Sequence, residues 1–204
     1  MKKYNVNIKM SLFLIILAAG EGKRLASNTP KTYIKVNDKT LLEHSLERFK
    51  NFKEIRKTIV VYNKKHTKHI NQLKLKKIIK IRGGSTRQQS TFTALKRLKK
   101  MNCKKVLIHD SARPYASKEL ISKIIYKLKK NHAVVPIIKV SDSTKRIKKN
   151  IIFKNIQRNS LRYAQTPQGF TFKKIYEKHK KNKNTQFDDD SSLFTNDGEK
   201  VVTI

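Results

Sequence analysis

Short apolar runs alternate along the chain with longer segments in which apolar residues recur every three or four positions. The run from Leu12 to Leu17 contains no polar residue, which is typical of a strand buried on both faces of a parallel sheet. Similar runs predict strands over residues 57–62, 77–81, 105–108, 133–138 and 200–204.

Segments with helical spacing separate most of these strands. They cover residues 40–49, 89–99, 118–129, 171–180 and 189–195. The first helix opens with Thr40 and Glu43, which have the spacing of a capping box. Strands that alternate with helices are typical of a layered α/β domain with a mostly parallel sheet, and this is the fold that we predict.

Residues 140–156 interrupt the alternation with a polar turn between two short strands. This pattern predicts a protruding β-hairpin arm at about residues 140–157 rather than a part of the sheet. Residues 11–204 then form a single domain, and the polar residues 1–10 form an N-terminal tail.

The composition limits the class of protein. A chain of 204 residues is long enough for one domain with a substantial core. Its single cysteine, Cys103, cannot form an internal disulfide and fits a reducing compartment, so we expect a cytoplasmic protein. No apolar run reaches the length of a membrane span, so we expect no membrane partner.

The formal net charge of +35 raises the hypothesis of a non-catalytic protein that binds nucleic acid. However, 39 of the 49 basic residues are lysines, and they are spread over the whole chain. Aromatic residues interleaved with arginines, as in a base-stacking surface, are missing. The codon bias of an AT-rich genome accounts for this composition, and we expect no specific nucleic-acid partner.

Small residues and then cations follow the first predicted strand. The small residues are Ala18, Ala19 and Gly20, and the cations are Lys23, Arg24 and Lys31. Small side chains let the backbone approach a ligand closely, and clustered cations favour a triphosphate. Neither a P-loop nor a dinucleotide-binding fingerprint is present. The loop predicts a triphosphate site, with an ordinary structural turn as the alternative.

This loop resembles the start of sugar-nucleotide and polyol-phosphate nucleotidyltransferases, with L-A-A-G-x-G-x-R at residues 17–24 and P-K at 30–31. Three later segments read GGSTRQQS at 83–90, HDSARP at 109–114 and QTPQGF at 165–170. In this order and spacing, the four segments resemble the 2-C-methyl-D-erythritol 4-phosphate cytidylyltransferases of the non-mevalonate isoprenoid pathway.

The resemblance extends from about Ser11 to the last residue. It implies a three-layer, Rossmann-like nucleotidyltransferase domain with the protruding arm. The implied reaction transfers a cytidylyl group from CTP to 2-C-methyl-D-erythritol 4-phosphate, with Mg²⁺ as the metal. The products are 4-diphosphocytidyl-2-C-methyl-D-erythritol and pyrophosphate.

The chemistry of this reaction indicates which residues to expect in catalysis. The attacking phosphate is already an anion, so the main barrier is the crowding of negative charge around the α-phosphorus. Arg24 and Lys31 are therefore the predicted catalytic cations, and the resemblance gives both residues that role. It adds Arg158, which it places at the polyol phosphate. Lys23 is interpreted as a neighbouring surface charge.

The resemblance also implies a set of nucleotide contacts. The segment at 83–90 holds cytosine and ribose in the family, through positions that correspond to Gly84, Ser85, Arg87 and Ser90. Relatives often have an acidic or small polar residue at the position of Ser85, and an ordinary helix cap by Ser85 or Thr86 is the alternative. Ala18, Ala19, Gly20 and Ser111 complete the predicted nucleotide site.

Asp110 ends a predicted parallel strand, where open α/β sheets bind their ligands. We predict that it contacts the ribose hydroxyls or the Mg²⁺ ion and also belongs to the substrate site. Arg113 could pair with Asp110 or bind the phosphate of the second substrate, and an ion pair without a catalytic role is the alternative. His109 is predicted to be structural, because this reaction has little use for a base.

The resemblance places the polyol phosphate beside the arm, partly across a dimer interface. The corresponding residues are Ser143 and Arg158, with Lys145 as a weaker candidate. In the family this arm embraces a second subunit, so a homodimer is expected. A solvated basic hairpin is the alternative.

The acidic cluster at residues 188–190 aligns with a segment of the family pattern that contains a threonine and two acids. Asp188 stands where the family has a threonine near the methylerythritol, which makes Asp188 a predicted substrate residue. Asp189 and Asp190 align with two acids of the family pattern. Acids here could also simply favour a helix N-terminus.

Three alternatives to the leading hypothesis stay open on the sequence alone. The family continues with an Asn-x-Lys-x-Thr segment and a final helix, whereas this chain stops at Ile204, so an inactive truncated relative is one alternative. Ribitol-5-phosphate cytidylyltransferase, which shares most motifs, is another, although residues 17–20 and 142–146 favour the isoprenoid enzyme. The third is the non-catalytic nucleic-acid-binding protein.

Overall fold

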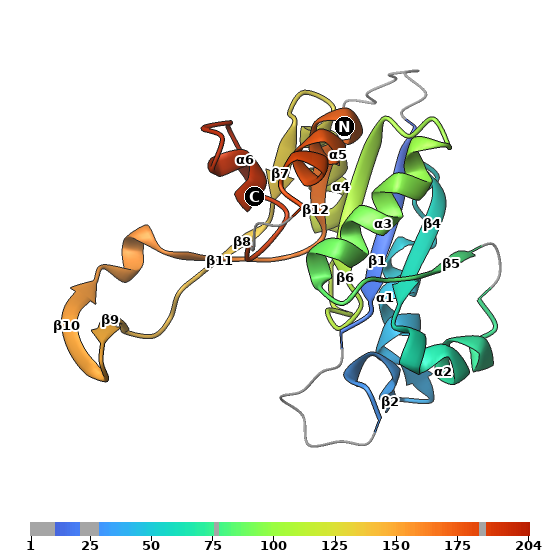
Figure 1. Cartoon of the computed structure of the whole chain (residues 1–204), viewed down its shortest axis with the longest axis horizontal. Helices are drawn as coiled ribbons and strands as arrows, with labels where there is room; N and C mark the ends of the chain where they lie inside the picture. Colours follow the sequence, from blue (N-terminus) through green and yellow to red (C-terminus); the bar gives the residue numbers. More distant parts are fainter. Residues whose placement is uncertain (1–10, 21–28, 76–77, 184–186) are drawn as a thin grey trace.

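The computed structural model describes residues 11–20, 29–75, 78–183 and 187–204. A seven-stranded sheet with the order β13-β7-β12-β6-β1-β4-β5 forms the centre of this part of the chain (Figure 1). Its strands are β1 (Leu12–Ala18), β4 (Ile55–Tyr62), β5 (Ile78–Arg82), β6 (Lys105–Asp110), β7 (Ala133–Val135), β12 (Gln168–Thr171) and β13 (Val202–Thr203). Only β12 runs antiparallel to its neighbours, so the predicted mostly parallel sheet is confirmed.

Helices cover both faces of this sheet. They are α1 (Leu41–Phe49), α2 (Thr67–Gln72), α3 (Arg87–Lys99), α4 (Lys118–Leu128), α5 (Phe172–Lys181) and α6 (Ser192–Thr195). Within the described residues, three short 3-10 helices lie in the connections: η1 (Lys31–Tyr33), η2 (Lys64–His66) and η3 (Arg158–Ser160). None of the helices in the described ranges has the length and apolar character needed to cross a membrane.

The alternation of side chains along β1 divides the core into two parts. Phe13, Ile15 and Leu17 pack with residues of α3, α5 and α6 on one face of the sheet. Leu12, Leu14 and Ile16 pack with residues of α1, α2 and α4 on the other face. Every β1 residue is buried, as the uninterrupted apolar run predicts, and the three-layer fold follows from this double coverage.

The capping box predicted at the start of α1 is confirmed. The Thr40 hydroxyl accepts a hydrogen bond from the backbone N–H of Glu43 at 3.2 Å, and the Glu43 carboxylate accepts one from the N–H of Thr40 at 2.8 Å. These reciprocal bonds satisfy two donors that the first turn of a helix otherwise leaves open.

Two predicted elements differ from the structure. The single strand expected over 133–138 is divided at Pro136 into β7 and β8 (Ile137–Lys139), and β8 pairs with β11 (Arg162–Ala164) outside the main sheet. Proline has no N–H to donate to a ladder, which favours a break at this position. The helix expected over 189–195 begins only at Ser192, because Asp189 binds the backbone ahead of it.

The sequence pattern missed several short elements. These are α2, β11, β12 and the small hairpin of β2 (Lys35–Val36) and β3 (Lys39–Thr40). The most consequential is β12, which lies between β6 and β7 and brings the QTPQGF segment into the sheet. Gln168 and Gly169 open this strand, and neither has a strong preference for extended structure.

The predicted arm is a hairpin of β9 (Thr144–Lys148) and β10 (Ile151–Ile156). Lys149 and Asn150 connect the two strands with φ angles of 46° and 63°, as a tight two-residue hairpin turn requires. The hairpin extends away from the central sheet, and it appears in orange at the side of Figure 1.

Candidate functional site

A cavity of about 870 Å³ lies where four neighbouring parallel strands end. Its walls include residues that follow β1, β4, β5 and β6, which is the edge where open α/β sheets bind ligands. Most of the predicted site residues meet here. They are Ala19, Gly20, Lys31, Gly84, Ser85, Arg87, Ser90, Asp110, Ser111 and Arg113.

The turn between β5 and α3 forms one wall of this cavity. Gly84 packs so closely on α3 that an added Cβ would lie 2.4 Å from the Cβ of Gln89. The N–H of Gly84 donates to the Ser90 hydroxyl at 3.1 Å, and the Ser85 hydroxyl donates to the Gln89 side chain at 2.7 Å. Thr86 is the residue that caps α3, by accepting from the N–H of Gln89 at 3.1 Å. The cap therefore belongs to Thr86, and Ser85 remains on the cavity wall.

Lys31 is exposed at the start of η1 and also lines this cavity. Buried hydrogen bonds hold this short helix at the end of β6. The Thr32 hydroxyl lies 2.9 Å from the Ser111 hydroxyl, and the Ser45 hydroxyl donates to the Ser111 carbonyl at 2.7 Å. Ser111, predicted to bind the nucleotide, thus also positions the segment that carries Lys31.

Asp110 and two arginines form the charged floor of the cavity. One Asp110 oxygen, Oδ1, is 3.4 Å from Nη2 of Arg87, and the other, Oδ2, is 3.2 Å from Nε of Arg113. Arg113 is also hydrogen-bonded to the Gln165 side chain. The predicted pairing of Asp110 with Arg113 is confirmed.

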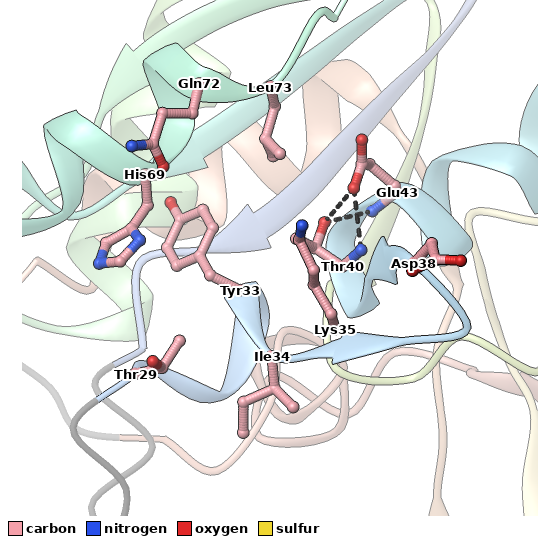
Figure 2. Close-up of a pocket in the computed structure, with 10 residues that line it drawn as sticks. All are labelled: Thr29, Tyr33, Ile34, Lys35, Asp38, Thr40, Glu43, His69, Gln72 and Leu73. Carbon is pink, nitrogen blue, oxygen red and sulfur yellow. Dashed lines mark hydrogen bonds between the residues drawn. The ribbon is translucent and has the colours of Figure 1, made fainter.

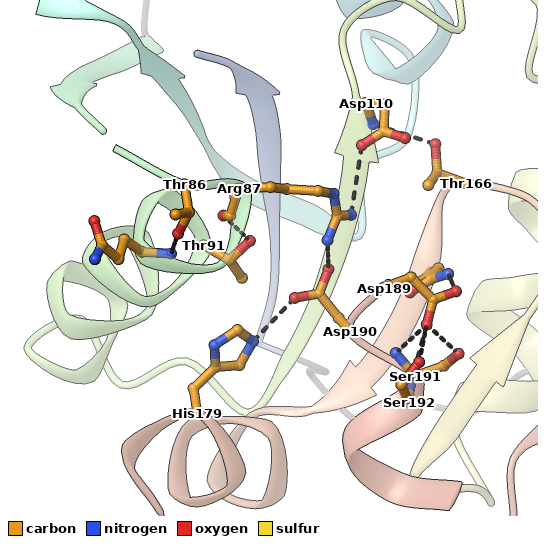
Figure 3. Close-up of polar contacts among 12 residues, drawn as sticks. Thr86, Arg87, Thr91, Asp110, Thr166, His179, Asp189, Asp190, Ser191 and Ser192 are labelled. Atoms are coloured by element: carbon orange, nitrogen blue, oxygen red, sulfur yellow. Dashed lines mark hydrogen bonds and ion pairs between the residues drawn. The ribbon is translucent and has the colours of Figure 1, made fainter. Parts of the chain in front are cut away.

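The second partner of Arg87 is Asp190, at 2.6 Å between Nη1 and Oδ2 (Figure 3). The Asp190 side chain is fully buried, and its other oxygen accepts a hydrogen bond from Nε2 of His179 at 2.9 Å. Burial opposes the ionisation of Asp190, but the attraction to Arg87 and the bond from His179 outweigh it and lower its pKa to about 2. Burial likewise opposes the charge on Arg87, yet the carboxylates of Asp190 and Asp110 raise the pKa of Arg87 above its usual value.

The sequence analysis placed Asp190 in the family pattern but not in the site, and it missed His179. One sequence feature could have suggested His179. It shares the helical spacing of Phe172 and Ile175, so it falls on the buried face of α5.

His109 has a structural role, as predicted. Its imidazole is buried, with Nε2 at 3.1 Å from the Arg113 carbonyl and Nδ1 at 3.0 Å from the Thr166 hydroxyl. Burial lowers the pKa of His109 to about 4, so the ring is neutral near pH 7. The Thr166 hydroxyl also accepts from the N–H of Asp110 at 3.2 Å, so these bonds fix the end of β6.

Two predicted residues, Ala18 and Ser143, lie apart from the cavity. Ala18 is the last residue of β1, is fully buried, and does not line the cavity, so its side chain cannot contact a nucleotide there. Ser143 is exposed at the base of the arm. Arg24 falls in residues 21–28, outside the described ranges.

Arg158 lines a smaller cavity of about 490 Å³ at the base of the arm, together with Lys139 and Arg162. Its guanidinium donates to the Ser141 carbonyl at 3.0 Å. Three cationic side chains around one hollow favour an anionic ligand such as a phosphate.

The three aspartates of the acidic cluster have different environments. Asp188 is exposed and does not line the large cavity. Asp189 accepts from the N–H groups of Ser191 and Ser192 at 2.9 and 3.1 Å, so the alternative of acids at a helix start is confirmed for this residue. Only Asp190 reaches the residues of the cavity, through Arg87.

A second pocket, of about 730 Å³, lies beside η1, β2 and α2 (Figure 2). Tyr33 stacks on His69 there, with ring centroids 5.0 Å apart, and the capping pair Thr40 and Glu43 forms another wall. None of the predicted site residues lines it.

The donors available for a metal ion are few. Within the described ranges, no group of three or more His, Cys, Asp or Glu side chains could hold one. Asp110 supplies one carboxylate at the cavity. Mg²⁺ is commonly held by one or two carboxylates together with substrate phosphates, so this donor set fits Mg²⁺ but not a structural zinc ion.

Comparisons with known proteins agree with this geometry. The family model described as IspD, 2-C-methyl-D-erythritol 4-phosphate cytidylyltransferase, matches residues 12–204. The chain is 43% identical over 196 residues to the bifunctional enzyme IspD/IspF of Pelagibacter ubique, a match that covers 96% of this chain and 52% of that enzyme. The chain thus spans about half the length of this relative.

Two further relatives are shorter proteins. The 2-C-methyl-D-erythritol 4-phosphate cytidylyltransferase of Petrotoga mobilis is 32% identical over 201 residues, which cover 95% of this chain and 88% of that protein. The crystal structure of 4-diphosphocytidyl-2C-methyl-D-erythritol synthase from Anaerococcus prevotii has a TM-score of 0.80 and 33% identity, and covers 96% of this chain and 89% of that chain. These relatives favour the methylerythritol phosphate enzyme over the two alternatives of a ribitol-5-phosphate cytidylyltransferase and a non-catalytic nucleic-acid-binding protein.

Proposed function

Because the chain belongs to the family of 2-C-methyl-D-erythritol 4-phosphate cytidylyltransferases, CTP-dependent nucleotidyltransferases of isoprenoid biosynthesis, we propose that its large cavity carries out this reaction. The observation that carries the proposal is the meeting of Lys31, Arg87, Arg113 and Asp110 at the ends of parallel strands. Such a cavity offers cations for a triphosphate, a carboxylate for ribose hydroxyls or a metal, and close access to backbone at Gly84.

CTP fits this cavity in one orientation. Cytosine and ribose lie against the turn formed by Gly84 and Ser85, where the Ser85 hydroxyl, which donates to Gln89, keeps acceptor capacity for the nucleotide. The triphosphate lies toward Ala19, Gly20 and Lys31, with Arg24 as the second predicted cation. Ser90 supports this turn from α3, and Arg87 of the same helix lines the cavity.

The reaction joins two anions, so its residues act mainly by position and charge. A phosphate oxygen of the polyol attacks the α-phosphorus of CTP, and the bond to the bridging oxygen breaks to release pyrophosphate. Lys31 and Arg24 reduce the repulsion as charge gathers at the α-phosphate. The neutral, buried imidazole of His109 is not required as a base.

We also propose Mg²⁺ as the metal of this site. Asp110 would hold it, together with phosphate oxygens of CTP. When bound, the ion would neutralise part of the triphosphate charge and orient the α-phosphate.

The second substrate and the arm belong together in this proposal. Apolar side chains on the hairpin, Ile147, Ile151, Ile152 and Phe153, are between 56% and 69% exposed. A projecting strand pair with this much apolar surface favours association with a second copy of the chain. A homodimer would place the arm of one copy beside the cavity of the other, with Arg158 and Ser143 binding the polyol phosphate and Asp188 nearby.

The buried position of Cys103 supports a reducing, cytoplasmic setting.

The test is pyrophosphate release from CTP and 2-C-methyl-D-erythritol 4-phosphate in the presence of Mg²⁺. Lys31→Ala should lower kcat/KM by roughly a hundredfold or more, because one cation at the α-phosphate is lost. Lys35→Ala is the matched control, since Lys35 is exposed nearby on β2 and does not line the cavity.

Three outcomes would count against the proposal. They are release that occurs without the polyol phosphate, a preference for ribitol 5-phosphate as acceptor, and an equal effect of the two lysine substitutions.

A further inference from the structure

Four side chains from distant parts of the sequence form a continuous chain of polar contacts that ends at the cavity. His179 on α5 contacts Asp190, Asp190 contacts Arg87 on α3, and Arg87 contacts Asp110 at the end of β6 (Figure 3). The first two residues are buried, with 1% and 0% of their surface exposed, whereas the last two line the cavity.

The distances show that Arg87 is bound more tightly at its buried end. Nη1 lies 2.6 Å from Asp190, and Nη2 lies 3.4 Å from Asp110. An arginine prefers a two-pronged pair with a single carboxylate when the geometry allows it. Asp190 blocks the end-on form of this pair at Asp110, because it holds one of the two terminal nitrogens of Arg87 on the buried side.

His179 in turn fixes the orientation of the Asp190 carboxylate. Its Nε2 donates to Oδ1, which leaves Oδ2 for Arg87. The imidazole itself lies between two aromatic rings, stacked on Phe92 with centroids 6.2 Å apart and edge-on to Phe187 at 5.4 Å. The carboxylate is therefore held by a ring that has little room to turn.

We propose that Asp190 and His179 are positioning residues for nucleotide binding, which hold Arg87 away from Asp110 so that the Asp110 carboxylate stays available to CTP. The inference rests on the proposed function, because it concerns the CTP part of that site. Among the described residues, each Asp110 side-chain oxygen contacts one arginine, at 3.4 and 3.2 Å, so each oxygen keeps a lone pair for ribose hydroxyls or a nucleotide-bound metal ion.

Asp190→Asn is the direct test, because it keeps the size of the side chain and removes its charge. Arg87 should then move toward Asp110, and CTP affinity measured by calorimetry should fall roughly tenfold to a hundredfold. The KM for the polyol phosphate should stay within about twofold, since that substrate lies at the arm. Asp189→Asn is the matched control, because Asp189 accepts from the N–H groups of Ser191 and Ser192 and from the Gln168 side chain, and makes no hydrogen bond to Arg87. CTP affinity should be retained in this variant.

His179 provides a second variant if Asp190→Asn does not fold. His179→Gln keeps a donor near Asp190 and should retain most of the CTP affinity, whereas His179→Ala should weaken it by roughly threefold to tenfold. Thermal unfolding measured on each protein identifies variants that have only lost stability. Equal CTP affinity in the glutamine and alanine variants would contradict the inference.

A double-mutant cycle separates positioning from general damage. In an Asp110→Asn background, Asp190→Asn should change CTP affinity by less than about twofold, because the carboxylate that it protects is gone. Additive effects would overturn the inference. If the unaltered protein neither binds CTP nor releases pyrophosphate, both proposals fail, whereas an active protein whose CTP affinity is unchanged by Asp190→Asn leaves the proposed function and rejects only the positioning role.

Discussion

The cavity and the arm are organised in opposite ways. At the cavity, polar side chains are already bound to partners within the chain, as in the contacts of Asp110, Arg87 and Ser111. On the arm, β9 and β10 contact mainly each other, and their large apolar residues face solvent. The difference indicates that the cavity is pre-organised within one copy of the chain, whereas the arm carries apolar surface that its own chain leaves exposed.

This comparison predicts a graded response of the free energy of unfolding. The free energy of unfolding should fall most when the buried His109 beside the cavity is charged, and less when the Gly84 turn on the cavity wall is altered. Changes on the arm should leave the free energy of unfolding of the single subunit almost unchanged. Three experiments follow this order.

Acid should produce the largest effect, through His109. Its folded pKa of about 4 lies below the usual value of 6.5, so the unfolded chain takes up a proton at a pH where the folded protein does not. The stability that the neutral ring contributes is complete above about pH 6.5 and is lost as the pH falls toward 4. The loss attributable to this group should reach about 3 kcal/mol at pH 4.

Urea unfolding between pH 7 and pH 4 measures this loss. His109→Gln cannot take up a proton and should flatten the dependence in that range. His132→Gln alters an exposed histidine and should leave the slope as it is. A slope that is identical in all three proteins would contradict the assignment to His109.

Gly84→Ala should have an intermediate effect. The added Cβ would lie 2.4 Å from the Cβ of Gln89, so the turn must move away from α3 at a cost of about 1–3 kcal/mol. CTP affinity should fall as well, because the turn forms the nucleotide wall. Ser85→Ala adds no atom and should cost less than about 1 kcal/mol, so equal losses of stability would argue against close packing as the cause.

A charge placed on the arm should have the smallest effect on the free energy of unfolding of the subunit. It should have a large effect on the association of two subunits. Phe153→Asp places a carboxylate on exposed apolar surface and should change the free energy of unfolding of the subunit by less than about 0.5 kcal/mol. It should convert the expected dimer to a monomer in analytical ultracentrifugation. Lys154→Asp puts the same charge at a neighbouring polar position and should preserve the dimer. A variant Phe153→Asp that remains dimeric would show that the arm is not the interface.

Local features of the fold could be predicted from the sequence because they depend on neighbouring residues. The apolar run of β1 requires burial on both faces, and the pairing of Thr40 with Glu43 is complete within one helical turn. The positive φ angles of Lys149 and Asn150, the two central residues of the arm hairpin, likewise follow from the local geometry of a tight turn. The motifs also reveal most of the cavity, since each follows a strand and the ends of parallel strands meet at one edge of a sheet.

Contacts between distant segments required the tertiary structure. The sequence does not show that β12 inserts between β6 and β7, that Ala18 points into the core, or that Pro136 separates two strands with different partners. The pairing of Arg87 with Asp190 spans 103 positions, and that of His179 with Asp190 joins α5 to the turn before α6 through a buried carboxylate. Residue types and local spacing determined where the chemistry lies, whereas the partners of each charge were decided by packing, because a buried ion pair forms only where the folded chain brings both groups out of water together.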